Sequence, residues 1–138
     1  MRNCPRRGRP RGAVLIEFVI VLPVFLLLLL AAIDWGWYFV VRENVVNATR
    51  EGARVGAAAP SGGAASLDAT TAVTNYLRNS LGERFVRNPE VSVVSVGGRQ
   101  AISVRLRDFP AGSITGFTPT HVPTTVTSTT IMRLEVQP

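Results

Sequence analysis

The chain has 138 residues and a formal net charge of +6 at pH 7, and 46% of its residues are hydrophobic. This length allows one ordinary domain with an attached segment. The charge alone would fit a nucleic-acid binder, but five Arg and no acidic residue precede Ala13, whereas the remainder has ten Arg against nine acidic residues. The sequence therefore predicts a basic N-terminal tag and no nucleic-acid partner.

An apolar run over residues 13–33 follows the tag and is long enough to cross a membrane, because a helix of about 20 residues rises about 30 Å. The run holds one charged residue, Glu17, and one proline, Pro23. Pro23 is either an ordinary proline of a membrane helix or the site of a kink. The basic tag predicts a cytoplasmic N-terminus and an extracytoplasmic remainder. We expect Asp34 to reach water at the exit. An aromatic belt follows it, at Trp35, Trp37, Tyr38 and Phe39.

Three kinds of segment could begin in this way. A secretory signal peptide would have a shorter apolar core and a cleaner cleavage site after it. A permanent signal anchor fits the length and the charge asymmetry. A prepilin leader, which is cut on the cytoplasmic side before the apolar run, fits as well.

The stretch RGAVLIEFVIVLP resembles the class III signal of type IV pilins and pseudopilins, in which a short basic leader ends in Gly and Glu is the fifth residue after the cut. The resemblance implies a leader over residues 1–12, cleavage between Gly12 and Ala13 by a prepilin peptidase, and Glu17 as the fifth mature residue. The apolar membrane helix would then begin with Val14, Leu15, Ile16 and Phe18 and contain Pro23.

The wider stretch from Arg11 to Ala57 is similar to the TadE-like family of tight-adherence (Flp-type) pilus systems. The matching features are Leu22-Pro23, Asp34 followed by Gly36, and the segment NATREGAR at residues 47–54. The resemblance implies a pseudopilin or minor pilin in the bacterial inner membrane that acts in pilus assembly or initiation. Its partners would be membrane lipids, the prepilin peptidase, other pilin or pseudopilin subunits and the assembly platform.

Glu17 needs an explanation because a carboxylate is costly inside a bilayer. It lies about 6 Å along the helix from the start of the run, so it could reach the cytoplasmic headgroups. The family resemblance implies another role, in which Glu17 pairs with the free amine of Ala13 on a neighbouring subunit. Such a pair would favour one docking position over slipped ones.

The first helix is expected to continue past the membrane to residue 59, before the breaker cluster PSGG. Small residues at 48–57 would allow close packing against a second helix or a sheet. A second helix is predicted over residues 67–81, capped by Ser66 and stopped by Gly82. Its buried stripe would consist of Leu67, Val73, Leu77 and Leu81.

Hydrophobic residues that alternate along the chain then predict three strands. Val91, Val93 and Val96 mark the first, and Ile102, Val104 and Leu106 mark the second, with a turn at residues 97–100. A loop is expected over residues 108–123 and a Thr-rich strand over residues 124–136. The predicted fold class is α+β: a long transmembrane helix with a second helix and a three-stranded antiparallel sheet. The predicted divisions are a leader (1–12), the membrane and extended helix (13–59) and an extracytoplasmic head (60–138).

No residue pattern predicts catalysis, a cofactor, a metal site or a small-molecule substrate. His121 is the only histidine and Cys4 the only cysteine, and neither has partners at metal-ligand spacing. The sequence therefore predicts a structural protein, not an enzyme. The alternative function is an uncleaved bitopic membrane protein whose outer domain binds another envelope component.

Overall fold

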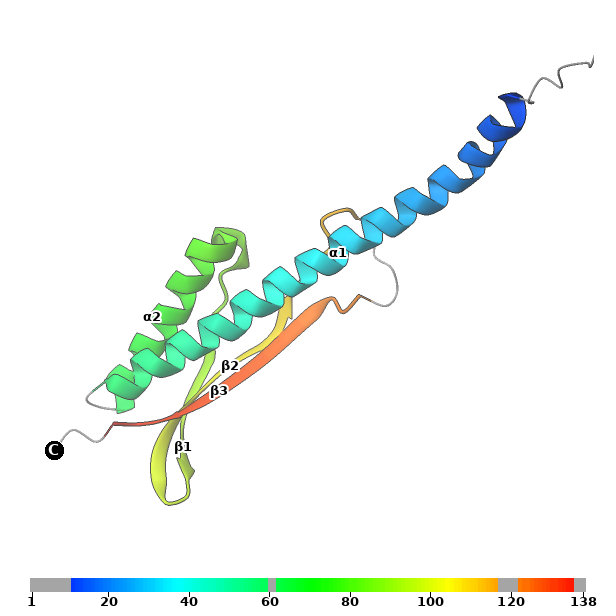
Figure 1. Cartoon of the computed structure of the whole chain (residues 1–138). Helices are drawn as coiled ribbons and strands as arrows, with labels where there is room; N and C mark the ends of the chain where they lie inside the picture. Colours follow the sequence, from blue (N-terminus) through cyan, green and yellow to red (C-terminus); the bar gives the residue numbers. More distant parts are fainter. Residues whose placement is uncertain (1–10, 60–61, 117–121, 136–138) are drawn as a thin grey trace, which may run out of the picture.

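A computed structural model describes residues 11–59, 62–116 and 122–135. Figure 1 shows a long helix that carries a small head of helix and sheet. The predicted α+β fold class is confirmed. The elements in chain order are α1 (Arg11–Ala58), α2 (Gly62–Leu81), the short 3-10 helix η1 (Glu83–Phe85), β1 (Glu90–Val96), β2 (Arg99–Pro110) and β3 (Thr125–Arg133).

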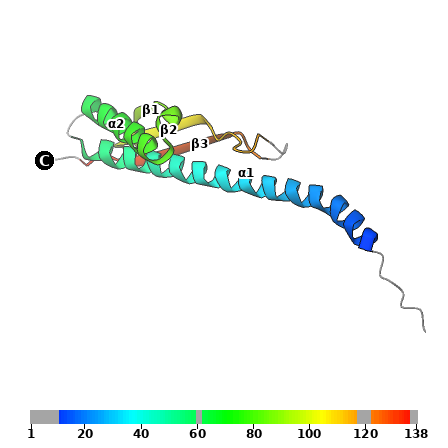
Figure 2. The same ribbon diagram turned by 90° about the horizontal axis from the view of Figure 1, so that it is seen from above.

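Helix α1 has two unlike halves. Its N-terminal half extends away from the rest of the molecule, whereas α2 and the sheet pack along its C-terminal half (Figures 1 and 2). The helix continues through Pro23 without a break, and Figure 2 shows it curving over its N-terminal part. The head is thus assembled on one end of a single continuous helix.

The three strands form an antiparallel sheet in the order β1-β2-β3. Gly97 and Gly98 make the two-residue turn between β1 and β2, with φ values of 60° and 76°. Glycine suits this turn because positive φ is strained for other residues. The predicted turn was too long, since Arg99 and Gln100 already pair with Val96 and Ser95.

The core lies between the C-terminal half of α1, α2 and one face of the sheet. Ile102, Val104 and Leu106 alternate toward the helices and are at most 2% exposed. A Cβ atom on Gly56 would lie 2.9 Å from the carbonyl oxygen of Ala65 and would also clash with Ile102. The small residues therefore allow the close packing that the sequence predicts.

A buried hydroxyl cluster joins α1 to β3. Thr49 is fully buried, and its Oγ1 donates to the carbonyl oxygen of Val46 at 2.9 Å. The same oxygen lies 2.9 Å from Oγ of Ser128 and accepts a hydrogen bond from Thr130 at 3.1 Å. The polar side chain is satisfied inside the core, as buried hydroxyls require.

The predicted start of the second helix was wrong. Helix α2 begins at Gly62, five residues earlier than expected, because the two alanines before Ser66 are strong helix formers. Ser66 is therefore inside the helix, where its Oγ donates to the carbonyl oxygen of Gly63 at 3.0 Å. Leu67 is 68% exposed and does not belong to the buried stripe, whereas Val73 and Leu77 are fully buried.

The predicted loop over residues 108–123 also began too early. Strand β2 extends to Pro110, and the pairing register shifts between Leu106 and Phe109, where Asp108 has a φ of 47°. This irregularity turns Phe109 into the core, where it is 1% exposed. The last strand, predicted over 124–136, spans Thr125–Arg133. Cys4 and His121 lie outside the described residues.

Candidate functional site

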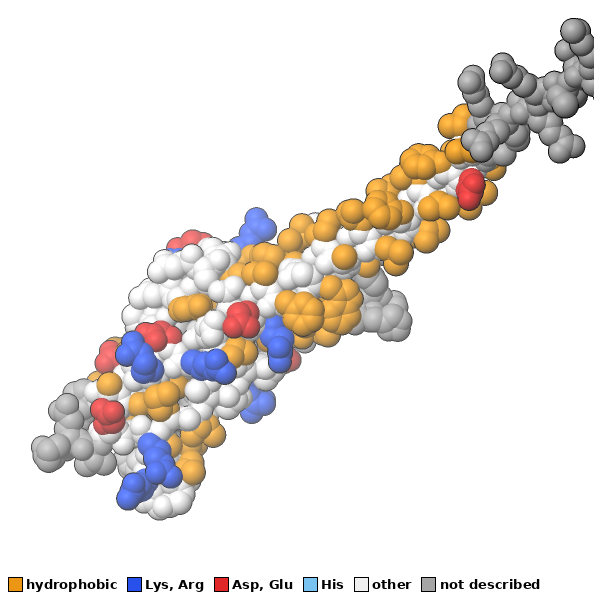
Figure 3. Space-filling view, viewed as in Figure 1, with side chains coloured by type: hydrophobic (Ala, Val, Ile, Leu, Met, Phe, Trp, Pro, Cys, Tyr) orange, Lys and Arg blue, Asp and Glu red, His pale blue; other side chains and the backbone are white. Residues whose placement is uncertain are grey.

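The N-terminal half of α1 is an apolar surface without an intramolecular cover. Val14, Leu15, Ile16 and Phe18 are each 60–67% exposed. Hydrophobic side chains cover this part of the helix in Figure 3. By length and composition α1 can cross a membrane, and it is the only such helix in the described part of the chain. The structure thus indicates a single-pass membrane anchor.

Glu17 interrupts this surface. It is the only acidic residue of the sequence before Asp34, and it lies exposed beside Val14, Phe18 and Val21 in a shallow groove along the helix. Within the described residues no hydrogen bond or ion pair involves its carboxylate. A carboxylate in apolar surroundings needs a partner from elsewhere.

The predicted processing pair lies at the start of α1. Gly12 and Ala13 are both helical, and Gly12 is exposed with nothing within 4 Å of the position of a Cβ atom. Glu17 follows Ala13 by four positions, so about one helical turn separates them. The structure brings these three residues to one end of the exposed helix, far from the head (Figure 1).

Sequence reasoning placed Asp34 wrongly. We expected it to reach water, but it is 1% exposed and lies against the loop between β2 and β3. Its Oδ2 accepts hydrogen bonds from the hydroxyls of Ser113 at 2.7 Å and Thr115 at 2.6 Å. Its Oδ1 accepts from the backbone amides of Ile114 at 3.0 Å and Thr115 at 3.1 Å. We call this arrangement the Asp34 clamp.

The Asp34 clamp is an electrostatically favourable arrangement. The hydroxyl of Thr115 makes the largest contribution to holding the pKa of Asp34 below its ordinary value. Burial opposes this by raising the pKa, while Ser113 and the two backbone amides lower it further. Because four donors stabilise the ionised form, the clamp requires a charged carboxylate. The clamp fixes the β2–β3 loop to α1 at Asp34, where the exposed apolar half of α1 ends and the half packed against the head begins.

The aromatic residues after Asp34 divide between two surroundings. Trp35 is 37% exposed and Phe39 is 55% exposed, and their ring centroids are 5.8 Å apart. Trp37 instead turns toward the head, where its ring lies 6.0 Å from that of Phe85. Only part of the predicted belt is therefore available to a membrane interface.

The described residues hold no group of three or more His, Cys, Asp or Glu side chains that could bind a metal ion. The site just described consists of the exposed apolar half of α1, the unpaired carboxylate of Glu17 and the Asp34 clamp. Such a set of residues can associate with lipid or with another helix.

The structure indicates a single-pass membrane protein in which one long helix is the anchor and also supports a small α+β head. Residues 12–54 match the model of the TadE-like protein family, so the resemblance drawn from the sequence is confirmed over this segment. The match covers less than half of the chain, and it shows that this segment is similar to TadE-like proteins, a Tad pilus-associated family that is not an enzyme family. Searches of curated proteins and of solved structures gave no match.

Proposed function

We propose that the protein is a pseudopilin or minor pilin of a tight-adherence (Flp-type) pilus, acting in pilus assembly or initiation. The observation that carries the proposal is the bare apolar half of α1, with Glu17 unpaired one turn after the bond between Gly12 and Ala13. A leader over residues 1–12 would be removed by a prepilin peptidase. Residues 13–59 would then form the membrane and extended helix, and residues 60–138 the extracytoplasmic head.

Cleavage would supply the partner that Glu17 lacks. The new α-amine at Ala13 carries a positive charge on the same apolar surface that carries the carboxylate. A pair formed within low-dielectric surroundings is strongly attractive, and an unpaired member is penalised. Helices that pack side by side would therefore prefer the position that joins Glu17 of one subunit to the Ala13 amine of its neighbour. The partners are other pilin subunits, the assembly platform and lipid.

The positive-inside rule and the basic residues of the leader favour a cytoplasmic N-terminus and a head outside the bacterial inner membrane. The same charge distribution would suit an uncleaved bitopic protein. In that alternative Glu17 reaches the cytoplasmic headgroups, and the outer domain alone binds another envelope component. The two alternatives differ in whether the peptide bond between Gly12 and Ala13 is cleaved.

The test is the intact mass and the N-terminal residue of the protein extracted from membranes that contain an active prepilin peptidase. We expect a chain that begins at Ala13. Gly12→Val is expected to block the cut, and Gly36→Val is the matched control, because neither glycine has a neighbour within 4 Å of an added Cβ. A full-length chain in the presence of the active peptidase would favour the bitopic alternative.

A second experiment isolates the role of Glu17. We expect Glu17→Gln to remain cleaved but to lose at least about tenfold in crosslinking between subunits, which corresponds to about 1.4 kcal/mol. Glu43→Gln is the control, because Glu43 is an exposed acid on the same helix outside the apolar run. Equal crosslinking in both variants would show that Glu17 does not determine subunit register.

A further inference from the structure

One face of the sheet is left uncovered by the helices. Ile102 and Val104 face α1 and α2, so Ala101, Ser103 and Arg105 point to the opposite side of β2. Strand pairing places neighbouring residues on the same side. We call this side the outer sheet face. It includes Val94, Ala101 and Ile131 at its centre and the cations Arg99, Arg105 and Arg133.

The outer sheet face has an excess of positive charge. Glu90, the acidic residue within the strands of this face, forms an ion pair with Arg107, at 3.0 Å between Oε2 and Nε. Among the described residues the remaining cations, Arg99, Arg105 and Arg133, have no acidic partner. The Nε of Arg105 is buried and has no hydrogen-bond partner in this part of the chain. A buried donor without an acceptor is costly.

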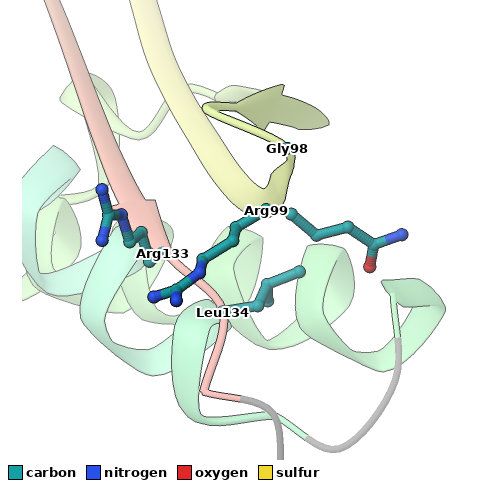
Figure 4. Close-up of a pocket in the computed structure, with 5 residues that line it drawn as sticks. Gly98, Arg99, Arg133 and Leu134 are labelled. Atoms are coloured by element: carbon teal, nitrogen blue, oxygen red, sulfur yellow. The ribbon is translucent and has the colours of Figure 1, made fainter.

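Arg99 and Arg133 line a cleft at the hairpin end of this face. Ala101 pairs with Arg133, and Arg99 precedes Ala101 by two residues, so the two arginines are diagonal neighbours about 7–8 Å apart. Figure 4 shows the Arg99 side chain reaching from the hairpin toward Arg133 and Leu134. The cleft has a volume of about 530 Å³. Two nearby guanidinium groups repel each other unless an anion lies between them.

Apolar side chains lie next to these cations. Ile131 is 55% exposed and Val96 is 43% exposed. Val96 pairs with Arg99, and Ile131 lies two residues before Arg133 on β3. Arginine beside exposed aliphatic surface is typical of protein interfaces, whereas a purely electrostatic surface would lack the aliphatic part.

The position of the cleft argues against membrane lipids as its occupant, and its charge argues against a second copy of this chain. Helix α1 continues from Ile33 to Ala58, about 37 Å of helix. The backbone amide of Glu135, next to the cleft residue Leu134, donates to the carbonyl oxygen of Ala57 at 3.0 Å. The cleft therefore lies at the end of the head remote from the membrane, out of reach of its lipids. A second copy docked face to face would oppose arginine to arginine, which is unfavourable.

We propose that the outer sheet face docks an acidic surface of a different protein, which places a carboxylate between Arg99 and Arg133 and separate apolar side chains on Ile131 and on Val96. The carboxylate satisfies both guanidinium groups through charge-assisted hydrogen bonds. The apolar contact removes aliphatic surface from water. This interaction is separate from the helix association described above and is independent of leader cleavage.

The proposal is tested on the full chain in uncharged detergent micelles, with poly-L-glutamate as the probe. The double variant Arg99→Gln, Arg133→Gln should bind at least about tenfold more weakly than the unmodified chain. The matched control is Arg84→Gln, Arg87→Gln, which removes the same charge from two exposed arginines outside the face. The control should change binding by less than about threefold, since exposed charges at a distance are screened by salt.

Two further measurements sharpen the outcome. The variant Arg99→Lys, Arg133→Lys keeps the charge but loses the planar fork, so it should bind more weakly than the unmodified chain. Ile131→Ser should weaken binding to a copolymer of glutamate and leucine and leave binding to poly-L-glutamate unchanged. Equal losses in the cleft and control pairs would overturn the proposal, because binding would then depend on total charge alone. Tighter binding of duplex DNA through Arg99 and Arg133 would overturn the choice of a protein partner.

Discussion

The two halves of α1 show how one continuous helix can serve two surroundings. From Val14 to Leu29 its large aliphatic side chains are exposed on all sides, and nothing in the described part of the chain covers them. From Val41 to Ala57 one side of the same helix is fully buried under α2 and the sheet. The chain thus has bulky residues where its own fold leaves the helix exposed, and small residues where the helix packs against its own head.

The difference lies in residue size as much as in hydrophobicity. A helix surrounded by lipid needs apolar side chains in every direction. A helix against a compact head needs a narrow face on which backbones approach closely, and Gly52 and Gly56 supply that face. The large residues of the first half could not be exchanged with those of the second half without loss of the core.

The largest expected effect comes from comparing one residue type in the two halves of the molecule. Phe109→Ala should lower the free energy of unfolding of the head by about 3–5 kcal/mol, because the ring is 1% exposed and stacks on Phe85 with centroids 6.4 Å apart. Phe25→Ala should leave it unchanged, since Phe25 is 57% exposed. Denaturant unfolding in detergent micelles, followed by circular dichroism, measures both.

A comparable loss of stability in the Phe25 variant would mean that the bare half of α1 packs on the head in solution. Such a result would remove the distinction between the two halves. Unchanged stability of the Phe109 variant would instead contradict the position of β2 after its register shift.

A glycine pair should give a smaller effect with opposite signs. Gly56→Ala should destabilise the head by about 1–3 kcal/mol, because the added methyl group would lie 2.9 Å from both the carbonyl oxygen of Ala65 and the Cβ atom of Ala69. Gly36→Ala should stabilise the helix by up to about 1 kcal/mol, because it meets no neighbour and alanine favours helix. The melting temperatures of the two variants measure the difference. A rise in both would contradict close packing at Gly56.

The smallest effect is local and concerns the junction between the halves. Asp34→Asn keeps the size of the side chain but loses the charge and one acceptor, so the loop after β2 should open more often. Amide exchange at Ile114 and Thr115, whose backbone amides donate to Asp34, should accelerate by roughly tenfold. Amides of the core strand β2 should exchange as before. Unchanged exchange at Ile114 would show that Asp34 does not hold the loop.

The charge of Asp34 gives this variant a pH signature. The folded state lowers the pKa of Asp34 below its ordinary value, so the stabilising contribution of its charge is complete above that ordinary value and is lost as the pH falls through the lower folded pKa. The difference in stability between the unmodified chain and Asp34→Asn should therefore be largest near neutral pH and shrink in acid. A difference that grows in acid would contradict an ionised clamp.

Much of the architecture could be predicted because it follows from local patterns. The apolar run of residues 13–33 has the length of a membrane span, and the alternation at Ile102, Val104 and Leu106 marks a strand with one buried face. Gly82 ends α2 with a φ of 93°, as its position predicts. Glu51 and Arg54, three positions apart on α1, form an ion pair at 2.8 Å, as helical spacing allows.

The errors arose where contacts distant in sequence decide the structure. Asp34 follows an apolar run and looks like an exit residue, but its partners lie about 80 positions later in the chain. Phe109 appeared to be in a Pro- and Gly-rich loop, and only the irregular pairing of β2 with β3 places it in the core. The one available signal was the cluster of Gly, Ser and Thr near Ser113, which can surround an anion with donors.

The most direct test of the two-environment account is labelling of single cysteines in sealed vesicles by a water-soluble maleimide, in a Cys4→Ser background. Val24→Cys lies on the bare half of α1, and Arg50→Cys lies exposed on the packed half. The account predicts that the residue introduced at 24 reacts only after the vesicles are dissolved in denaturing detergent. The residue at 50 should react from the side on which the head lies. Equal reactivity at both positions in intact vesicles would contradict a membrane location for the first half of α1.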